Sequence, residues 1–242
     1  MITMTMLTIE NISLGYGKKI LLRDISATAA AGELIMLAGR NGSGKSTLLR
    51  AVTGLAKPLS GRILADGKDI SAISRNEAAM KVSFVSTERI RIPRFRCRDI
   101  VALGRAPWTG WAGRLSDTDE QTVADAMETV GMSGFADRTM DSMSDGECQR
   151  IMIARALAQD TPLMVLDEPS AFLDVPGRHQ ITDILKRLAA EKGKTVIFST
   201  HDISIGLKRA DKVWLIDGDS LIVRNAANAA TDILNLFGIS GI

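Results

Sequence analysis

The sequence predicts an α/β fold in which a sheet core carries a helical insert, and three observations support this prediction. Short apolar runs that are typical of buried strands alternate with helical patterns, both early in the chain and beyond residue 160. One such run, at 34–38, passes directly into glycine-rich sequence that leads into a helix. Between about residues 88 and 160, helical patterns follow one another with Gly, Pro and Trp breaks between them.

The expected elements follow in order along the chain. Strands are expected at 7–14, 20–26, 34–38, 61–66, 82–85, 163–166, 195–199 and 212–216. Helices are expected at 45–54, 99–104, 117–131, 144–158, 177–191, 203–209 and 231–237. The first two strands are expected to pair with each other. No internal repeat and no low-complexity linker divides the sequence, so we expect one domain.

Bulk composition excludes several classes of protein. Of the 242 residues, 45% are apolar and 24% are charged, which is ordinary for a globular protein. A net charge of only +2 gives no strong reason to expect a nucleic-acid partner. Cys97 and Cys148 fit neither a zinc site nor a disulfide framework, so free thiols in a reducing cytoplasm are expected. No apolar run approaches the roughly 18 residues of a membrane span, and no signal peptide is recognisable. Met1, Met4 and Met6 leave the natural start open.

Residues 39–47 match the phosphate-loop pattern G-x-x-x-x-G-K-[ST], between a predicted strand and a predicted helix. The glycines let backbone N–H groups turn toward phosphate oxygens, and a helix N-terminus favours negative charge. Lys45 would supply a positive charge to the β- and γ-phosphates, and the Ser46 hydroxyl would ligate Mg²⁺. We therefore expect a nucleotide site built by Gly39, Arg40, Asn41, Gly42, Ser43, Gly44, Lys45, Ser46 and Thr47.

Two carboxylates, Asp167 and Glu168, end the apolar run at 163–166. Side chains alternate along a strand, so the two are expected to point in different directions. One of the two could hold Mg²⁺, directly or through water, and the other could face an attacking water as general base, a role worth ~10²–10⁴-fold in rate. Such a pair is weak evidence alone, but together with the phosphate loop it predicts phosphoryl transfer to water.

Residues 143–147, M-S-D-G-E, resemble the signature L-S-G-G-Q of the ABC ATPases, with Met for Leu, Asp for the first Gly and Glu for Gln. The segments at 148–150 and 154–157 are similar to the family's usual continuation. The resemblance implies that Ser144, Gly146 and Glu147 contact ATP. Ser144 and Glu147 also form the pattern of a helix capping box, and both readings hold together because a capped helix N-terminus is an anion site.

The remaining motifs fall in the order of the ABC family. Tyr16, the only tyrosine, lies where the family has an aromatic residue that stacks on adenine. The segment 169–174 resembles the one that ends in the D-loop. His201 follows a predicted strand and precedes Asp202, which matches the switch histidine that contacts the γ-phosphate. His179 has no such motif and is given no role.

The resemblance covers roughly residues 5–225 and is closest to the ATPases of iron-siderophore, haem and cobalamin importers, a branch suggested by V-A-L-G-R-A-P at 101–107. It implies one ABC ATPase domain over 1–242 with a P-loop NTPase (RecA-like) core. An antiparallel β subdomain and that core would occupy about 1–87 and 161–242, and a helical subdomain bearing the signature about 88–160. The resemblance also implies catalysis by Glu168, His201 and Lys45, with ATP and Mg²⁺ bound.

The resemblance further implies partners and a location. Two copies would bind head to tail, with Ser144 and Gly146 of one acting on the ATP held by the phosphate loop of the other. Transmembrane permease subunits would hold the pair at the cytoplasmic face of the inner membrane, a substrate-binding protein would act indirectly, and no nucleic acid would bind. ATP would close the pair, and hydrolysis with product release would open it.

The sequence departs from the family at one position. The family has a glutamine after an apolar strand, in a loop that reaches both Mg²⁺ and the membrane subunit, and this chain has Thr87 there. The threonine hydroxyl has a shorter reach than glutamine. We therefore hypothesise that the neighbouring Glu88 couples the loop to the metal.

Three alternative functions stay open at this level. An ABC ATPase acting on ribosomes or DNA usually has two such domains, long coiled coils or zinc insertions, and none is recognisable here. A GTPase would need a guanine motif of the N-K-x-D type, which is missing. An exporter ATPase is disfavoured only by the closer resemblance to importers, because the motifs do not fix the direction of transport.

Two surface features have two readings each. Trp108 and Trp111 would either form a partner-contact patch or be buried in the insert. A run of arginines would either meet the permease or anionic lipid or be a solvated face, and it comprises Arg89, Arg91, Arg94, Arg96 and Arg98.

Overall fold

The structure, a computed structural model, describes residues 4–17, 19–88, 92–110 and 113–237. Its strands are β1 (Thr5–Tyr16), β2 (Lys19–Ala30), β3 (Leu34–Gly39), β4 (Ser60–Ala65), β5 (Lys68–Asp69), β6 (Val82–Val85), β7 (Leu163–Leu166), β8 (Thr195–Ser199), β9 (Lys212–Asp217) and β10 (Ser220–Asn225). Its α-helices are α1 (Lys45–Val52), α2 (Arg75–Ala79), α3 (Cys97–Ala102), α4 (Asp117–Thr129), α5 (Asp145–Ala158), α6 (Val175–Lys192), α7 (Ile203–Arg209) and α8 (Ala230–Phe237).

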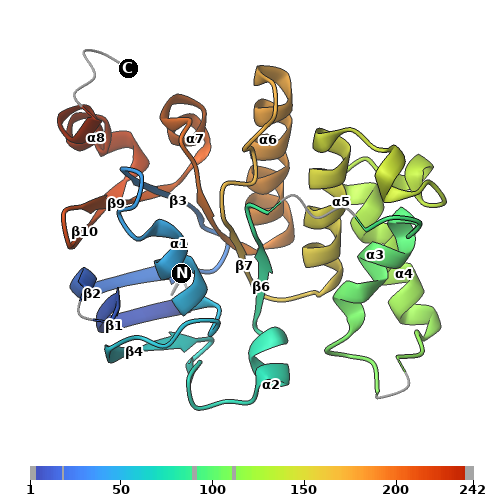
Figure 1. The fold of residues 1–242 in the computed structure, drawn as a ribbon, viewed down its shortest axis with the longest axis horizontal. Helices are drawn as coiled ribbons and strands as arrows, with labels where there is room; N and C mark the ends of the chain where they lie inside the picture. The colour runs from blue at the N-terminus through green and yellow to red at the C-terminus, as the bar shows by residue number, and fades with distance from the viewer. Residues whose placement is uncertain (1–3, 18, 89–91, 111–112, 238–242) are drawn as a thin grey trace.

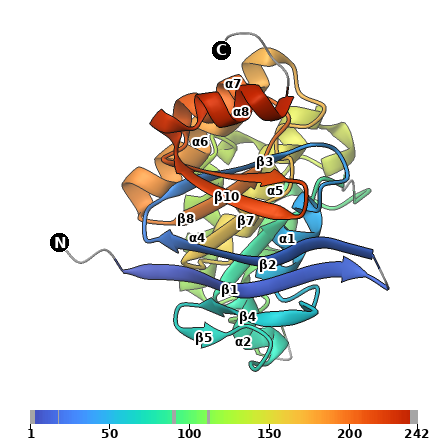
Figure 2. The same ribbon diagram turned by 90° about the vertical axis from the view of Figure 1, so that its left-hand side faces the viewer.

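The strands form two sheets. One is antiparallel, with the order β2-β1-β4-β5. The other has the order β10-β9-β3-β8-β7-β6, in which all neighbours are parallel except β10 and β9. The antiparallel sheet lies at the side of the molecule farthest from α3, α4 and α5 (Figures 1 and 2).

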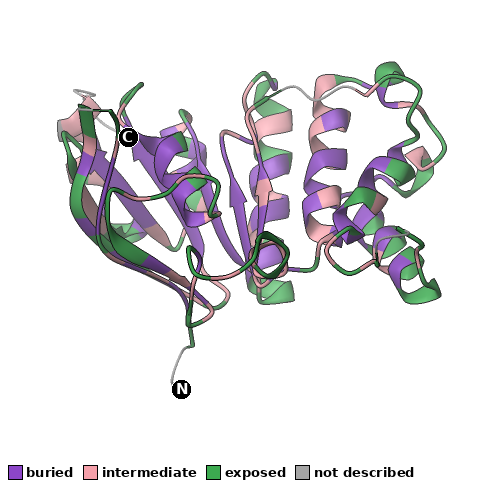
Figure 3. Cartoon of the chain, turned by 60° about the horizontal axis from the view of Figure 1, so that its bottom comes forward, coloured by how far each residue is buried: buried purple, intermediate pink, exposed green. Residues whose placement is uncertain are grey.

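The parallel sheet is buried on both faces, which explains why its strands are continuous apolar runs. Along β3, Ile35 and Leu37 belong to a core that also holds α1 and the antiparallel sheet, whereas Leu34, Met36 and Ala38 belong to a second core under α6 and α7. The strands of this sheet are coloured largely purple, as buried, in Figure 3. Because α1 lies between the two sheets, the phosphate loop before it is fixed from both sides.

The helices α3, α4 and α5 pack against one another, away from the antiparallel sheet (Figure 1). The Arg105 guanidinium joins them, since it donates to Asp119 Oδ1 of α4 at 2.8 Å and to the carbonyl of Ala158, at the end of α5, at 2.8 Å. The side chain of Gln159 then donates to the carbonyls of Ala79 (2.6 Å) and Val82 (3.2 Å), which ties α5 to the edge strand β6.

The predicted strands and helices are confirmed with shifts of a few residues at their ends. The pattern misses the short elements α2 and β5 and the whole of β10, the antiparallel edge strand. Cys97 and Cys148 are both buried and form no disulfide among the described residues. Among the helices of the described residues, none combines the length and apolar character that crossing a bilayer requires.

Trp108 and part of the arginine run can be compared with the sequence reading. The Trp108 indole donates to the carbonyl of Gln159 at 2.8 Å while its ring stays partly exposed, so it is neither fully buried nor a free patch. Arg94, Arg96 and Arg98 are exposed. Arg96 pairs with Asp137 at 3.3 Å on the surface. Trp111, Arg89 and Arg91 lie outside the described residues.

Candidate active site

The loop between β3 and α1 has a backbone that only glycine adopts easily. Gly42 and Gly44 have φ of 74° and 103°, in the left-handed region. A side chain on Gly39 would place its Cβ 2.7 Å from Ser43 Oγ, so the loop closes tightly on the end of the strand. Gly44 is the N-cap of α1, and α1 therefore presents its N-terminus to the loop.

Lys45 lies inside this loop. Its ammonium donates to the carbonyl of Gly39 at 2.9 Å and to that of Arg40 at 3.3 Å, and the residue is only 6% exposed. Burial lowers the pKa of Lys45 from its ordinary value, while the Glu168 and Asp167 carboxylates oppose that shift. The loop lysine and the acid pair therefore act on one another electrostatically, as one phosphate-binding centre requires.

A hollow of about 360 Å³ opens at this loop. Tyr16, the last residue of β1, borders it, and its hydroxyl lies 3.2 Å from Thr47 Oγ1. The tyrosine is 61% exposed, so its ring is accessible at the entrance. The hollow is lined by Tyr16, Leu21, Asn41, Gly42, Gly44, Lys45, Ser46, Thr47 and Glu168.

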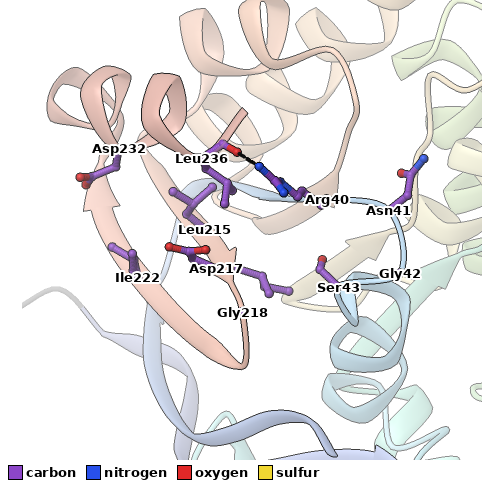
Figure 4. A pocket seen from close by; sticks show the side chains of 11 residues that line it. Arg40, Asn41, Gly42, Ser43, Leu215, Asp217, Gly218, Ile222, Asp232 and Leu236 are labelled. Carbon is purple, nitrogen blue, oxygen red and sulfur yellow. Dashed lines mark hydrogen bonds between the residues drawn. The ribbon is translucent and has the colours of Figure 1, made fainter. Parts of the chain in front are cut away.

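The side chain of Arg40 is directed away from this hollow. Its Nε and Nη2 atoms donate to the carbonyl of Leu236 in α8, at 3.2 and 2.8 Å (Figure 4). With β9, β10 and α8 it borders a separate hollow of about 650 Å³. Arg40 thus contributes its backbone carbonyl to Lys45, and its guanidinium holds the phosphate loop to α8.

The acid pair follows β7. Asp167 is buried, and its Oδ1 accepts a hydrogen bond of 2.7 Å from the hydroxyl of Ser199. Glu168 borders the phosphate-loop hollow, and its Oε1 lies 2.5 Å from His201 Nε2. The two carboxylates thus take different partners, although both lie beyond the end of β7 at Leu166. Ser199 is missing from the sequence reading, although a polar residue that ends an apolar strand two positions before the histidine is a recognisable signal.

The Thr87 hydroxyl donates to the backbone carbonyl of Asp167 at 3.0 Å, which places this residue beside the acid pair. Glu88 is exposed and borders a different hollow of about 360 Å³, together with Arg50, Phe84 and Arg155. The side chains of Thr87 and Glu88, two of the four metal contacts expected from the sequence, therefore have different surroundings in the structure.

The signature segment begins α5. Ser144 is the N-cap, its Oγ accepts from the Glu147 backbone N–H at 3.3 Å, and Glu147 Oε2 accepts from the Ser144 N–H at 2.7 Å. The predicted capping box is therefore confirmed. Hydrogen bonds from the Ser144 backbone and hydroxyl lower the pKa of Glu147. Ser144, Gly146 and Glu147 do not line the phosphate-loop hollow.

The segment 169–174 joins the acid pair to α6. Phe172 has a φ of 69° and is 58% exposed, and Asp174 caps α6 by accepting from the Gly177 N–H at 3.0 Å. A Cβ on Gly146 would meet Leu173 Cδ2 at 3.6 Å, so this segment touches the signature helix. It therefore joins the acid-pair side of the molecule to the signature side.

Comparison with known proteins agrees with this site. Residues 22–171 match the family model described as ABC transporter. The petrobactin import ATP-binding protein of Bacillus subtilis is 36% identical over 217 residues, which are 90% of this chain and 85% of that protein. The cobalamin import ATP-binding protein of Halobacterium salinarum is 37% identical over 81% of this chain, but the match spans only 49% of that protein.

A solved structure gives the same fold. A dimeric ATP-binding cassette in a post-hydrolysis state, bound to ADP and Pi, superposes with a TM-score of 0.78 at 26% identity, and the match covers 91% of this chain and 99% of that one. The chain belongs to the ABC transporter family, and its phosphate loop and acid pair make it one of that family's ATPases. The expected resemblance to siderophore and cobalamin importers is confirmed.

Proposed function

We propose that two copies of this chain bind and hydrolyse ATP head to tail, and that the pair drives import of an iron complex or cobalamin through a membrane permease. The separation of the two motifs carries this proposal. No residue of the signature segment lines the hollow at the phosphate loop, although each chain has one phosphate loop and one signature segment. A second copy supplies the missing half, and the dimeric cassette and the importer relatives support this arrangement and cargo class.

The ATP phosphates bind at the loop N–H groups and Lys45, and the adenine stacks on Tyr16. Water attacks the γ-phosphorus in line with the departing ADP oxygen. Glu168 accepts the proton of that water, and His201 holds the γ-phosphate. Ser144 and Gly146 of the other copy donate hydrogen bonds to the same phosphate.

Mg²⁺ fits the oxygen donors present. Ser46 lines the hollow, and Asp167 Oδ2 accepts no hydrogen bond from any residue that the structure describes. Hard oxygen ligands of this kind suit Mg²⁺. When bound, the ion offsets phosphate charge. Thr87 supports Asp167 through a hydrogen bond to its backbone carbonyl.

The loop around Glu88 is the proposed permease contact. Its hollow shares Leu55 and Phe84 with a neighbouring one of about 540 Å³, which also includes Pro58, Ile73 and other apolar residues. Leu55 is 67% exposed and borders both hollows, so it adds apolar surface to the groove that a partner would cover. A permease that docks here would touch the segment that adjoins Asp167, and would hold the protein at the cytoplasmic face of the membrane.

The head-to-tail arrangement is tested by mixing two inactive variants. Lys45→Ala removes phosphate binding, and Ser144→Arg blocks the signature. In a head-to-tail pair made of one chain of each kind, one site combines two intact halves. We therefore expect ATP turnover to return on mixing. Turnover that stays absent, although mixed pairs form, would show that each chain works alone.

The transport role is tested in native membranes. Extraction in mild detergent followed by mass spectrometry should identify a permease with many membrane spans beside this chain. Uptake of a ferric siderophore, haem and cobalamin, each radiolabelled, is then compared with and without the chain. Ribosomal proteins or nucleic acid in place of a permease would contradict transport and leave the ATPase assignment standing.

A further inference from the structure

We propose that Ser199 is a positioning residue for hydrolysis, because its single hydroxyl fixes both members of the acid pair. The hydroxyl donates to Asp167 Oδ1 at 2.7 Å and accepts from the backbone N–H of Glu168 at 2.8 Å. Through one oxygen, β8 thus positions the carboxylate that would hold the metal and the backbone of the residue that would act on the attacking water. This inference rests on the roles proposed for Asp167 and Glu168.

The Ser199 hydroxyl is buried, which makes its two hydrogen bonds hard for solvent to replace. Ser199 is 0% exposed, and its strand lies between β3 and β7 in the middle of the sheet. Its neighbour Leu37 on β3 is also fully buried. Deleting the hydroxyl would leave the Asp167 oxygen without its donor and the Glu168 N–H without its acceptor, which costs free energy for each group that stays unpaired.

The Glu168 backbone is the reason that this support matters. Glu168 has a φ of 50°, in the left-handed region that disfavours residues with a side chain. The hydrogen bond from its N–H to Ser199 holds this bend. The bend directs the carboxylate toward His201, 2.5 Å away. Without this hydrogen bond, the backbone of Glu168 would relax toward ordinary φ and ψ angles, and the Glu168 carboxylate would move away from His201.

Thr195 provides the matched control. It lies on the same strand, is equally buried, and its hydroxyl donates to the carbonyl of Ala30 at 2.9 Å. That bond supports the fold and touches neither acid. Thr195→Val removes this hydroxyl with almost no change in shape, as Ser199→Ala does at the other end of β8.

Three measurements test the inference. For Ser199→Ala we expect the maximal ATP turnover to fall by about 10- to 100-fold, the range for second-layer residues at metal sites. Nucleotide affinity without Mg²⁺ should stay within about twofold, because the phosphate loop is intact. The gain in affinity on adding Mg²⁺ should shrink. Thr195→Val should keep both turnover and the Mg²⁺ gain.

The third measurement needs neither ATP nor metal. The chain has two histidines, His179 and His201, so His201 gives one of two Hε1 ring signals in the proton NMR spectrum. We expect this signal to move in nucleotide-free Ser199→Ala and to stay in Thr195→Val. An unmoved signal together with turnover and Mg²⁺ response like those of Thr195→Val would overturn the inference. Lack of turnover in the unaltered protein would instead reject the proposed function, while the NMR result would still decide the position of Glu168.

Discussion

Asp167 and Ser199 are almost fully buried at the ends of β7 and β8, whereas Ser144 is exposed at the start of α5. The acid pair is held by strands that come from distant parts of the sequence. The signature segment is held by its own capping box, within four residues. The geometry of the acid pair therefore depends on the whole fold. The geometry of the signature segment is already set by its own residues within a single chain.

This difference teaches how the two halves are expected to respond to change. Loss of a buried contact at the acid pair should affect chemistry without affecting where the nucleotide binds. Loss of the exposed cap should affect local helix stability and the contact with a second copy. The predictions below separate these effects.

The largest effect is expected for Glu168→Gln. The amide cannot accept the proton of the attacking water, so turnover should fall by about 10²–10⁴-fold. ATP binding should persist, because the phosphate loop and Lys45 are unchanged. Size-exclusion chromatography with ATP and Mg²⁺ should then reveal an accumulating dimer. Turnover near that of the unaltered protein would remove Glu168 from its role.

Ser144→Ala should have the next largest effect on turnover. Loss of a hydrogen bond to a charged phosphate is worth about 1.5–3 kcal/mol, so turnover should fall roughly ten- to hundredfold. Loss of the cap should also reduce the free energy of unfolding by about 1 kcal/mol.

Ser116→Ala is the matched control for this change. Ser116 caps α4 through an equivalent capping box with Asp119. It should lose similar stability in chemical denaturation but keep turnover. Equal losses of turnover in the two variants would mean that Ser144 acts only on the helix.

The sequence predicts the buried strands and the phosphate loop well, because apolar runs and glycine-rich loops are recognisable local patterns. Such local patterns predict the strand at 34–38, the phosphate loop and the position of the acid pair. The contacts of Ser199 and of Arg40 with Leu236 join residues 31 to 196 positions apart, and no local pattern contains them. β10 was missed because it is an edge strand whose burial is only partial.

The helical side should lose stability in acid through Asp119. Hydrogen bonds from the Ser116 hydroxyl and backbone, and then from Arg105, lower the pKa of Asp119 from 3.8 to about 2. Because the folded-state pKa is the lower one, the stabilisation is complete above about pH 4 and disappears as the pH falls through about 2. Asp119→Asn should therefore reduce the free energy of unfolding at pH 7 by about 1–3 kcal/mol.

Urea denaturation from pH 7 down to pH 2 measures this effect. The curves of Asp119→Asn and the unaltered protein should converge at the acid end. Asp125→Asn, on the same helix but exposed, should differ little at any pH. A constant gap between the Asp119→Asn and unaltered curves would show that the carboxyl charge is not the cause.

The smallest effect concerns the loop in which Thr87 replaces glutamine. Thr87→Val keeps the shape but removes the hydrogen bond to the Asp167 carbonyl, which is worth about 0.5–1.5 kcal/mol and predicts a two- to tenfold rise in the Mg²⁺ concentration needed for half-maximal turnover. Glu88→Ala decides whether the hypothesis of a Glu88 contact to the metal stands. If Glu88 instead faces the permease, its loss should leave the Mg²⁺ requirement of the isolated protein unchanged and weaken only permease-stimulated turnover. A larger Mg²⁺ effect for Glu88→Ala than for Thr87→Val would restore the metal role to Glu88, and would show that the loop moves toward the acid pair when nucleotide binds.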